Sequence, residues 1–163
     1  VKWDKALSPE GQFIDVDTTP VVDENGRVYA ASYKEGLYAL DAATGDTLWH
    51  TNTAGVTQLL HAGGTIYASG DQQMQAVSVA TGRALWAVAL KGKSAQLPVL
   101  AQGYLVIPIH DALVFVDPLT GRQRVAWDPG QGVSSTPAWS GSHLYVLSNL
   151  GYIYSMRLAG RRG

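Results

Sequence analysis

The sequence has no cysteine among its 163 residues. This excludes disulfide bonds, thiolate metal sites and cysteine nucleophiles, although a chain without cysteine is compatible with every redox compartment. Apolar runs are short as well, and none approaches the roughly 18 residues that a membrane-spanning helix needs. Charge is also scarce: charged residues make up 15% and the formal net charge is -1. Because no basic field is available to hold phosphates, we expect no nucleic-acid partner.

No targeting pattern is visible in the sequence either. The chain begins at Val1, and no signal-peptide pattern follows it. We therefore expect an internal or C-terminal segment of a longer protein. What the chain does have is apolar residues at 46% and 18 glycines, which together favour a packed core interrupted by many turns.

A repeat of 37 to 39 residues runs through the chain. Segments 37–45, 74–82 and 113–121 align without gaps, and each ends on a Thr-Gly pair with its glycine at Gly45, Gly82 or Gly121. A more divergent fourth copy covers 152–160, a further 39 residues along the chain. Repeats of about 40 residues with four strands each are typical of β-propellers.

Within each repeat, short β-branched and aromatic segments alternate with polar residues, which predicts strands. We therefore predict an all-β fold: a β-propeller of four-stranded antiparallel blades, about four in this chain and half of an eight-bladed ring. The expected blades of this single domain, 1–163, are 14–53, 54–90, 91–130 and 131–160, with 1–3 as the end of a preceding or closing outer strand.

The turn and the tryptophan of each repeat have separate structural roles. Asp41 and Asp117 open the turn, and a carboxylate there can accept hydrogen bonds from turn N–H groups. The glycine that follows can take the left-handed conformation that returns the chain. Trp49 and Trp86 lie four residues after their glycines and are large enough to fill the wedge between blades. The third copy places Trp127 six residues after its glycine, on the same strand face.

The fourth repeat stops after its third strand, near Leu158. A sheet edge without a partner exposes backbone donors and acceptors and invites association. Residues 1–3 resemble the end of an outer strand, with Trp3 in the position of Trp49. They can close the ring within the chain or belong to a blade outside it, and the sequence leaves both open. The expected partners therefore include the remaining blades or a second copy that completes the ring.

The Ala-x-Asp-x-x-Thr-Gly-x-x-x-Trp pattern at 39–49 resembles the tryptophan-docking repeats of PQQ-type β-propellers. The string Asp-Val-Asp-Thr-Thr-Pro at 15–20 is similar to a signature in the second half of the BamB family. The similarity continues through 38–41, 66–67, 71–72, 97–100 and 151–155.

Resemblance to the BamB family implies a non-enzymatic scaffold subunit of the outer-membrane β-barrel assembly machinery. It implies a location at the periplasmic face of the bacterial outer membrane, with membrane contact only through an N-terminal lipid anchor that these residues do not include. The implied partner is the set of periplasmic POTRA domains of BamA. In the family a loop with two aspartates contributes to this contact, and the matching residues are Asp15 and Asp17.

Both aspartates have other interpretations. Aspartates before a strand commonly cap turns with their carboxylates. Together with Asp23 and Glu24 they could also surround Ca²⁺, but their spacing is not that of the EF-hand loop. We expect neither a metal nor a cofactor.

Catalytic groups are not predicted. The four histidines are too far apart in sequence to form a local metal pair. The serines before the inner strands lack a Gly-x-Ser-x-Gly elbow and occupy repeat positions before proline, which indicates a structural role. These residues are His50, His61, His110, His143, Ser94, Ser134 and Ser135.

Two other classes of protein share the repeat. PQQ-dependent dehydrogenases need Ca²⁺ ligands and, in many cases, a vicinal disulfide. The ligand set cannot be assembled from this sequence, and the cysteines are missing. Propeller sensor domains of PQQ-repeat kinases are interaction modules with the same fold, and only the string at 15–20 and the C-terminal similarity favour the BamB family over them.

Overall fold

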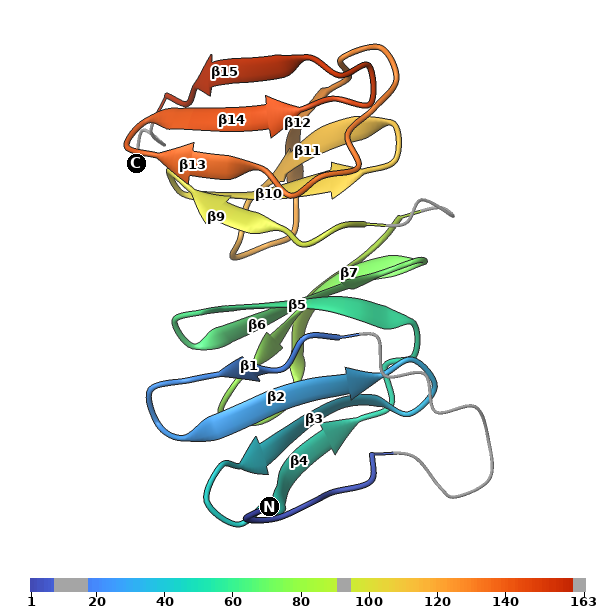
Figure 1. Ribbon diagram of the computed structural model, residues 1–163, viewed down its shortest axis with the longest axis vertical. Helices are drawn as coiled ribbons and strands as arrows, with labels where there is room; N and C mark the ends of the chain where they lie inside the picture. The colour runs from blue at the N-terminus through green and yellow to red at the C-terminus, as the bar shows by residue number, and fades with distance from the viewer. Residues whose placement is uncertain (8–17, 91–94, 160–163) are drawn as a thin grey trace.

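The computed structural model describes residues 1–7, 18–90 and 95–159 of the chain. All regular structure in these ranges is β-strand, arranged in four antiparallel sheets that follow one another along the chain (Figure 1). This confirms the all-β propeller prediction. Within the described ranges, no helix is long and apolar enough to cross a membrane.

Each of the first three sheets has four strands in the order of the sequence. The first sheet contains β1 (Val21–Val22), β2 (Arg27–Ser32), β3 (Gly36–Asp41) and β4 (Thr47–Thr51). The second contains β5 (Val56–Ala62), β6 (Thr65–Gly70), β7 (Gln73–Ser78) and β8 (Ala84–Ala89). The third contains β9 (Val99–Ala101), β10 (Tyr104–Ile109), β11 (Ala112–Val116) and β12 (Gln123–Trp127). These are sheet limits; the blade limits, which fall in the connections, stay predictions.

The same β-bulge recurs between the third and outer strands of these sheets. Trp49 lies opposite Ala39, but Thr47 lies opposite Leu40, so Leu48 is the extra residue. The second sheet repeats this with Trp86 opposite Ala76. A bulge bends its strand and redirects side chains. It therefore sets the direction of both tryptophans in the same way.

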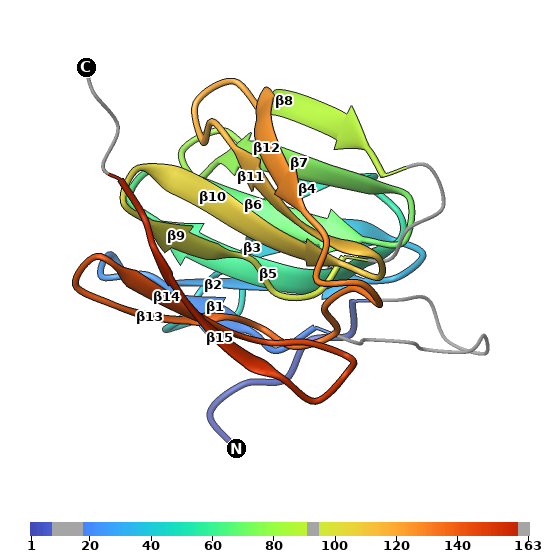
Figure 2. The same cartoon turned by 90° about the horizontal axis from the view of Figure 1, so that it is seen from above.

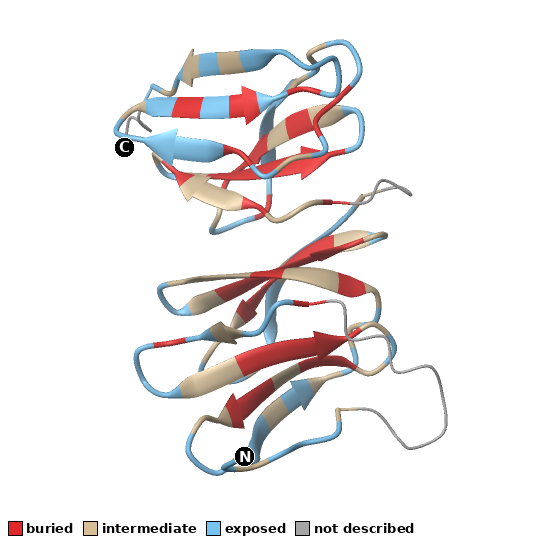
Figure 3. Cartoon of the chain, in the orientation of Figure 1, coloured by how far each residue is buried: buried red, intermediate tan, exposed pale blue. Residues whose placement is uncertain are grey.

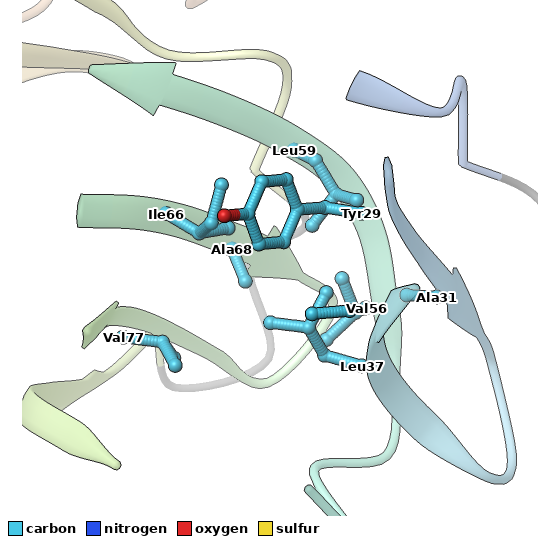
Figure 4. Close-up of a cluster of buried hydrophobic side chains, with 9 residues drawn as sticks. Tyr29, Ala31, Leu37, Val56, Leu59, Ile66, Ala68 and Val77 are labelled. Atoms are coloured by element: carbon cyan, nitrogen blue, oxygen red, sulfur yellow. The ribbon is translucent and has the colours of Figure 1, made fainter. Parts of the chain in front are cut away.

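The core lies between successive sheets and not within any one of them. Four buried residues of the first sheet contact five buried residues of the second (Figure 4). Similar clusters join the second sheet to the third and the third to the fourth. Seen from above, the sheets lie over one another (Figure 2), and buried segments run through the middle of each (Figure 3). The first cluster consists of Tyr29, Ala31, Leu37, Ala39, Val56, Leu59, Ile66, Ala68 and Val77.

Within the described residues, the fourth sheet has three strands: β13 (Ala138–Ser140), β14 (His143–Leu147) and β15 (Ile153–Arg157). Residues 1–7 do not supply its outer strand, because they lie against the first sheet at the opposite end of the stack (Figure 1). The sequence left two possibilities open for residues 1–3. The structure does not adopt the first, in which they close the ring within this chain.

Candidate functional site

Three tryptophans join consecutive repeats through one kind of hydrogen bond. The indole Nε1–H of Trp49 donates to the carbonyl oxygen of Val79 at 2.9 Å, and that of Trp86 donates to Pro118 at 2.9 Å. Trp3 donates to Ala42 at 3.0 Å. Each acceptor lies three residues before the turn glycine of the repeat that receives the ring. The bond satisfies the only polar atom of a side chain that is otherwise apolar.

Each indole ring packs directly against the turn glycine of the repeat that it contacts. A Cβ atom on Gly82 would come within 2.8 Å of the Trp49 ring, and one on Gly121 within 2.6 Å of Trp86. Gly82 has φ of 69°, a conformation that L side chains rarely adopt. Glycine is therefore required here for two reasons, the backbone conformation and the close approach of the ring.

The aspartates of the turns accept hydrogen bonds. Asp41 Oδ1 accepts the backbone N–H groups of Ala43 at 2.7 Å and Thr44 at 3.0 Å. These bonds hold the pKa of Asp41 below its usual value of 3.8. Asp117 Oδ1 accepts the N–H of Leu119 at 3.0 Å, and its Oδ2 accepts a charge-assisted bond from Arg124 at 2.9 Å. Both aspartates thus stabilise turns.

Trp127 contacts the fourth sheet through a different geometry. Its ring lies edge-on to Tyr154 of β15, with the ring centroids 4.9 Å apart and the planes at 79°. Aromatic pairs favour such edge-to-face contacts.

The turns between second and third strands lie beside the connections that lead to the next sheet. The N–H of Gly55 donates to Tyr33 at 2.7 Å, and that of Leu90 donates to Gln72 at 2.7 Å. In the last sheet the N–H of Asn149 donates to Gly132 at 3.1 Å. We call this surface the connection face; its described residues are 18–20, 33–35, 52–55, 71–72, 90, 95–98, 110–111, 128–137 and 148–152.

Acidic side chains predominate on the described part of the connection face. It carries the carboxylates of Glu35, Asp71, Asp111 and Asp128, but of the lysines and arginines only Lys34. The Tyr33 hydroxyl donates to Asp71 Oδ2 at 3.2 Å and so links the first two sheets at this surface. A surface of this kind suits a basic protein partner.

The aspartates that the sequence singled out, Asp15 and Asp17, lie outside the described residues. The next residue is firmly held: Thr18 is buried, its hydroxyl donates to the carbonyl of Ala31 at 3.1 Å, and it accepts the N–H of Ala31 at 3.0 Å. Ser135 makes the matching bond to Leu147 in the fourth sheet, at 3.0 Å. The chain that carries the two aspartates therefore joins the propeller at a fixed point.

The carboxylate of Asp23 accepts hydrogen bonds within its own turn. Its Oδ1 accepts the N–H groups of Asn25 and Arg27, both at 2.9 Å, and its Oδ2 accepts the hydroxyl of Tyr29 at 2.8 Å. Burial raises the pKa of Asp23, but these hydrogen bonds and the Arg27 charge outweigh burial and hold it below 3.8. Burial and then the bond to Asp23 raise the pKa of Tyr29 to about 12. Sequence reasoning missed this link, although the Asp-x-Asn-Gly spacing signals a capped turn.

The histidines are dispersed. His50 stacks on Tyr38 with ring centroids 4.1 Å apart, and His61 stacks on Tyr29 at 6.0 Å. His110 and His143 are exposed, as is Glu24. Over the ranges that the structure describes, no three His, Cys, Asp or Glu residues lie close enough together to hold a metal ion. Ser94, like the two aspartates before Thr18, lies outside those ranges.

An apolar pocket of about 220 Å³ opens between the second and third sheets, beside Trp86. Its described lining includes Val88, Ile107 and Val114, together with the amide side chain of Gln123. The described residues that line it carry no carboxylate, imidazole or hydroxyl group.

Comparison with known proteins points to one family. The family described as outer membrane protein assembly factor BamB matches this chain twice, over residues 1–88 and 70–161. BamB of Escherichia coli K12 is 30% identical over 149 residues, which cover 87% of this chain and 37% of that protein. BamB of Legionella pneumophila is 23% identical over 166 residues, 98% of this chain and 42% of that protein. The chain thus spans less than half the length of these relatives.

Solved structures agree on the fold. The crystal structure of BamB from Moraxella catarrhalis superposes with a TM-score of 0.75 at 18% identity, over 88% of this chain and 47% of that one. The computationally designed Ika4 protein gives 0.73 at 16% identity, over 96% of this chain and 100% of that one. With the family match over both halves of the sequence, the chain belongs to the family of the outer membrane protein assembly factor BamB.

Proposed function

We propose that this chain is a non-enzymatic scaffold segment of the outer-membrane protein assembly complex and acts at the periplasmic face of the outer membrane. Its relatives are named as assembly factors of outer membrane proteins. The described site residues support a structural role, since their polar atoms are engaged in turns and between blades. A rigid fold with its charged loops on one face is a common way to present a binding surface.

The proposed partner is the set of periplasmic POTRA domains of BamA, and the proposed contact includes Asp15 and Asp17. Side chains two residues apart on an extended segment point to the same side, so the sequence spacing of the two aspartates predicts one acidic patch. Such a patch suits Arg or Lys on the partner, through charge-assisted hydrogen bonds. The attachment of Thr18 to Ala31 is the observation that carries this proposal, because it joins the loop to a rigid sheet.

The test is a calorimetric titration of the periplasmic region of BamA with the wild-type chain and with a variant that carries Asp15→Lys and Asp17→Lys. Reversing both charges places like charges against a basic partner, so we expect the dissociation constant to rise by at least about tenfold, or 1.4 kcal/mol.

The matched control carries Glu24→Lys and Asp46→Lys. It changes the charge equally, but both residues are exposed in turns at the ends of strands opposite to the connection face. We expect the control to bind like the wild type. If the two variants bind equally well and both keep their β-sheet circular dichroism, the two aspartates have no part in the contact.

A further inference from the structure

The outer strand of the second sheet has no hydroxyl, amide or charged side chain. β8 reads Ala-Leu-Trp-Ala-Val-Ala, and all its residues except the half-buried Trp86 are exposed. The outer strands of the first and third sheets contain polar residues, such as His50 in β4 and Arg124 in β12. Proteins commonly protect an edge strand with charged side chains, because an unprotected edge pairs with other chains. β8 carries no such protection.

The free edge of β8 presents backbone groups that can pair. β8 pairs with β7, and within the described residues no strand lies on its other side. The N–H of Leu90 donates to the turn before β7 at 2.7 Å. Because bonding alternates along an antiparallel strand, Val88 also bonds toward β7, whereas the N–H and C=O groups of Ala87 and Ala89 point outward. This edge belongs to an internal sheet, which the first and third sheets flank (Figure 2).

The apolar pocket beside Trp86 lies along the same edge. Trp86, Val88 and Leu90, which are alternate residues of the chain, line one side of it, and Ile107 and Val114 of the third sheet line the other. An apolar cavity of about 150 Å³ already holds a benzene-sized group. The volume of about 220 Å³ therefore leaves room for an apolar side chain of a ligand.

The equivalent positions between the first and second sheets are polar. Thr51 and Thr53 follow their tryptophan by two and four residues, as Val88 and Leu90 do in the next repeat. The Thr53 hydroxyl donates to Gln75 Oε1 of the facing sheet at 3.4 Å and lies 3.2 Å from the Thr51 hydroxyl. The repeat thus accepts polar side chains here, so the fold itself does not require the apolar row beside β8.

We propose that β8 binds an extended polypeptide segment, which adds a fifth strand to the second sheet. Apolar side chains at every second position of this segment face the third sheet and cover the pocket, and the polar side chains between them face solvent. The segment is uncharged where it contacts the protein, because β8 offers no partner to a buried charge. This contact lies along the outer strand and is separate from the BamA contact proposed for the connection face.

The shape of β8 favours a flexible segment over a second folded copy. Its β-bulge at Leu85 bends the strand. Bulges of this kind hinder edge-to-edge pairing between folded sheets. An unfolded segment can follow the bend, and pairing with Ala87 and Ala89 needs only the regular part of the strand.

The first experiment titrates the chain into two fluorescein-labelled synthetic peptides and follows fluorescence anisotropy. The peptide Lys-Thr-Leu-Ser-Val-Thr-Leu-Ser-Lys alternates polar and apolar residues, and the peptide Lys-Leu-Val-Leu-Thr-Ser-Thr-Ser-Lys has the same composition without the alternation. We expect the alternating peptide to bind at least about tenfold more tightly. Equal affinities, or no binding up to about 1 mM, would overturn the proposal.

The second experiment methylates backbone nitrogens of the alternating peptide, either on Thr and Ser or on Leu and Val. The two sets of N–H groups point to opposite edges of an extended strand. In an antiparallel strand the Thr and Ser residues lie opposite Ala87 and Ala89, so their methylation should weaken binding at least about tenfold, and the other set should have little effect. The reverse result would support parallel pairing at this edge. Equal effects would show that the edge is not used.

The third experiment places a charge beside the pocket. Val88→Lys should weaken binding of the alternating peptide at least about tenfold, whereas Val125→Lys, on the outer strand of the third sheet, should bind it like the wild type. Val88 is 37% exposed and Val125 is 55% exposed, so a lysine fits at either position. Equal binding by the two variants would place the peptide elsewhere. If Val88→Lys does not fold, the methylated peptides still decide, because they use the wild-type chain.

Light scattering without peptide tests a second copy as the occupant. The proposal predicts the monomer mass of 17.4 kDa. A larger mass that Val88→Lys returns to 17.4 kDa would show that β8 pairs with another copy of the chain, and it would overturn the proposal.

Discussion

At the scale of single residues, the junction between blades depends on a tryptophan and a glycine from different repeats. The indole of Trp49 needs a flat surface and a backbone acceptor, and the turn around Gly82 provides both within four residues. The acceptor, Val79, lies three residues before the glycine. The Thr-Gly turn therefore reverses the chain and also provides the surface on which the ring packs.

The glycine prediction separates these two roles. Gly82→Ala meets a positive φ and a ring 2.8 Å from the new Cβ, while Gly63→Ala meets a positive φ of 57° with nothing within 4 Å. The backbone cost alone is about 1–2 kcal/mol. We therefore expect Gly63→Ala to lower the free energy of unfolding by that amount and Gly82→Ala by at least about 1 kcal/mol more. Urea denaturation measures both, and equal losses would show that the ring simply moves aside.

A second residue-scale prediction concerns acid. Because the pKa of Asp23 is lower in the folded than in the unfolded chain, its ionised form stabilises the fold above the unfolded value of about 3.9. This stabilisation is lost as pH falls through the folded pKa. Asp23→Asn should therefore flatten the decline of the unfolding free energy below about pH 4. The control is Glu24→Gln at the exposed neighbour. Parallel curves for the wild type and Asp23→Asn would contradict this role.

At the scale of elements, a polar side chain just before the inner strand, or at its start, is hydrogen-bonded to the second strand in three of the sheets. The Thr18, Thr57 and Ser135 hydroxyls donate to carbonyl groups at matching positions in β2, β6 and β14. In the first and fourth sheets this bond lies where the connection ends and the sheet begins, and in the second it lies at the start of β5. The connection face thus consists of loops attached to rigid positions.

Thr18→Val tests this attachment. Valine keeps the shape of threonine but leaves the N–H of the buried Ala31 without its partner, which typically costs about 1–3 kcal/mol. The matched control is Thr19→Val, one residue further on and exposed, which should change stability by less than about 0.5 kcal/mol. Thermal and urea unfolding of both variants give the difference. If Thr18→Val were as stable as the control, the attachment would have to come from elsewhere in the loop.

Much of the element scale could be predicted from the sequence, because the repeat places glycine and tryptophan at fixed offsets. Strands, turns and the three-stranded last sheet follow from that spacing. The acceptor of each indole could not be predicted, because it is a backbone carbonyl and has no side-chain signature. The position of Trp3 could not be predicted either: its docking on Gly45 depends on a contact between segments about 40 residues apart, which periodicity alone does not assign to this chain or another.

At the scale of the whole molecule, the connection face of the sheet stack bears on function. It is acidic in the described loops, which suits recognition of a basic partner. Because the chain belongs to the BamB family, we propose that this face takes part in outer membrane protein assembly. The fold alone would not support that role. The loop with Asp15 and Asp17 belongs to the same proposal.

Hydrogen–deuterium exchange of the chain with and without the periplasmic region of BamA tests the central claim most directly. The account predicts that slowed exchange is confined to the connection face, in the loop before Thr18 and in the neighbouring turn at 33–35. The turns at the opposite ends of the strands, at 23–26 and 41–46, should exchange at unchanged rates. Protection of those opposite turns, or no protection anywhere at saturating BamA, would contradict the claim that this propeller binds its partner through the connection face.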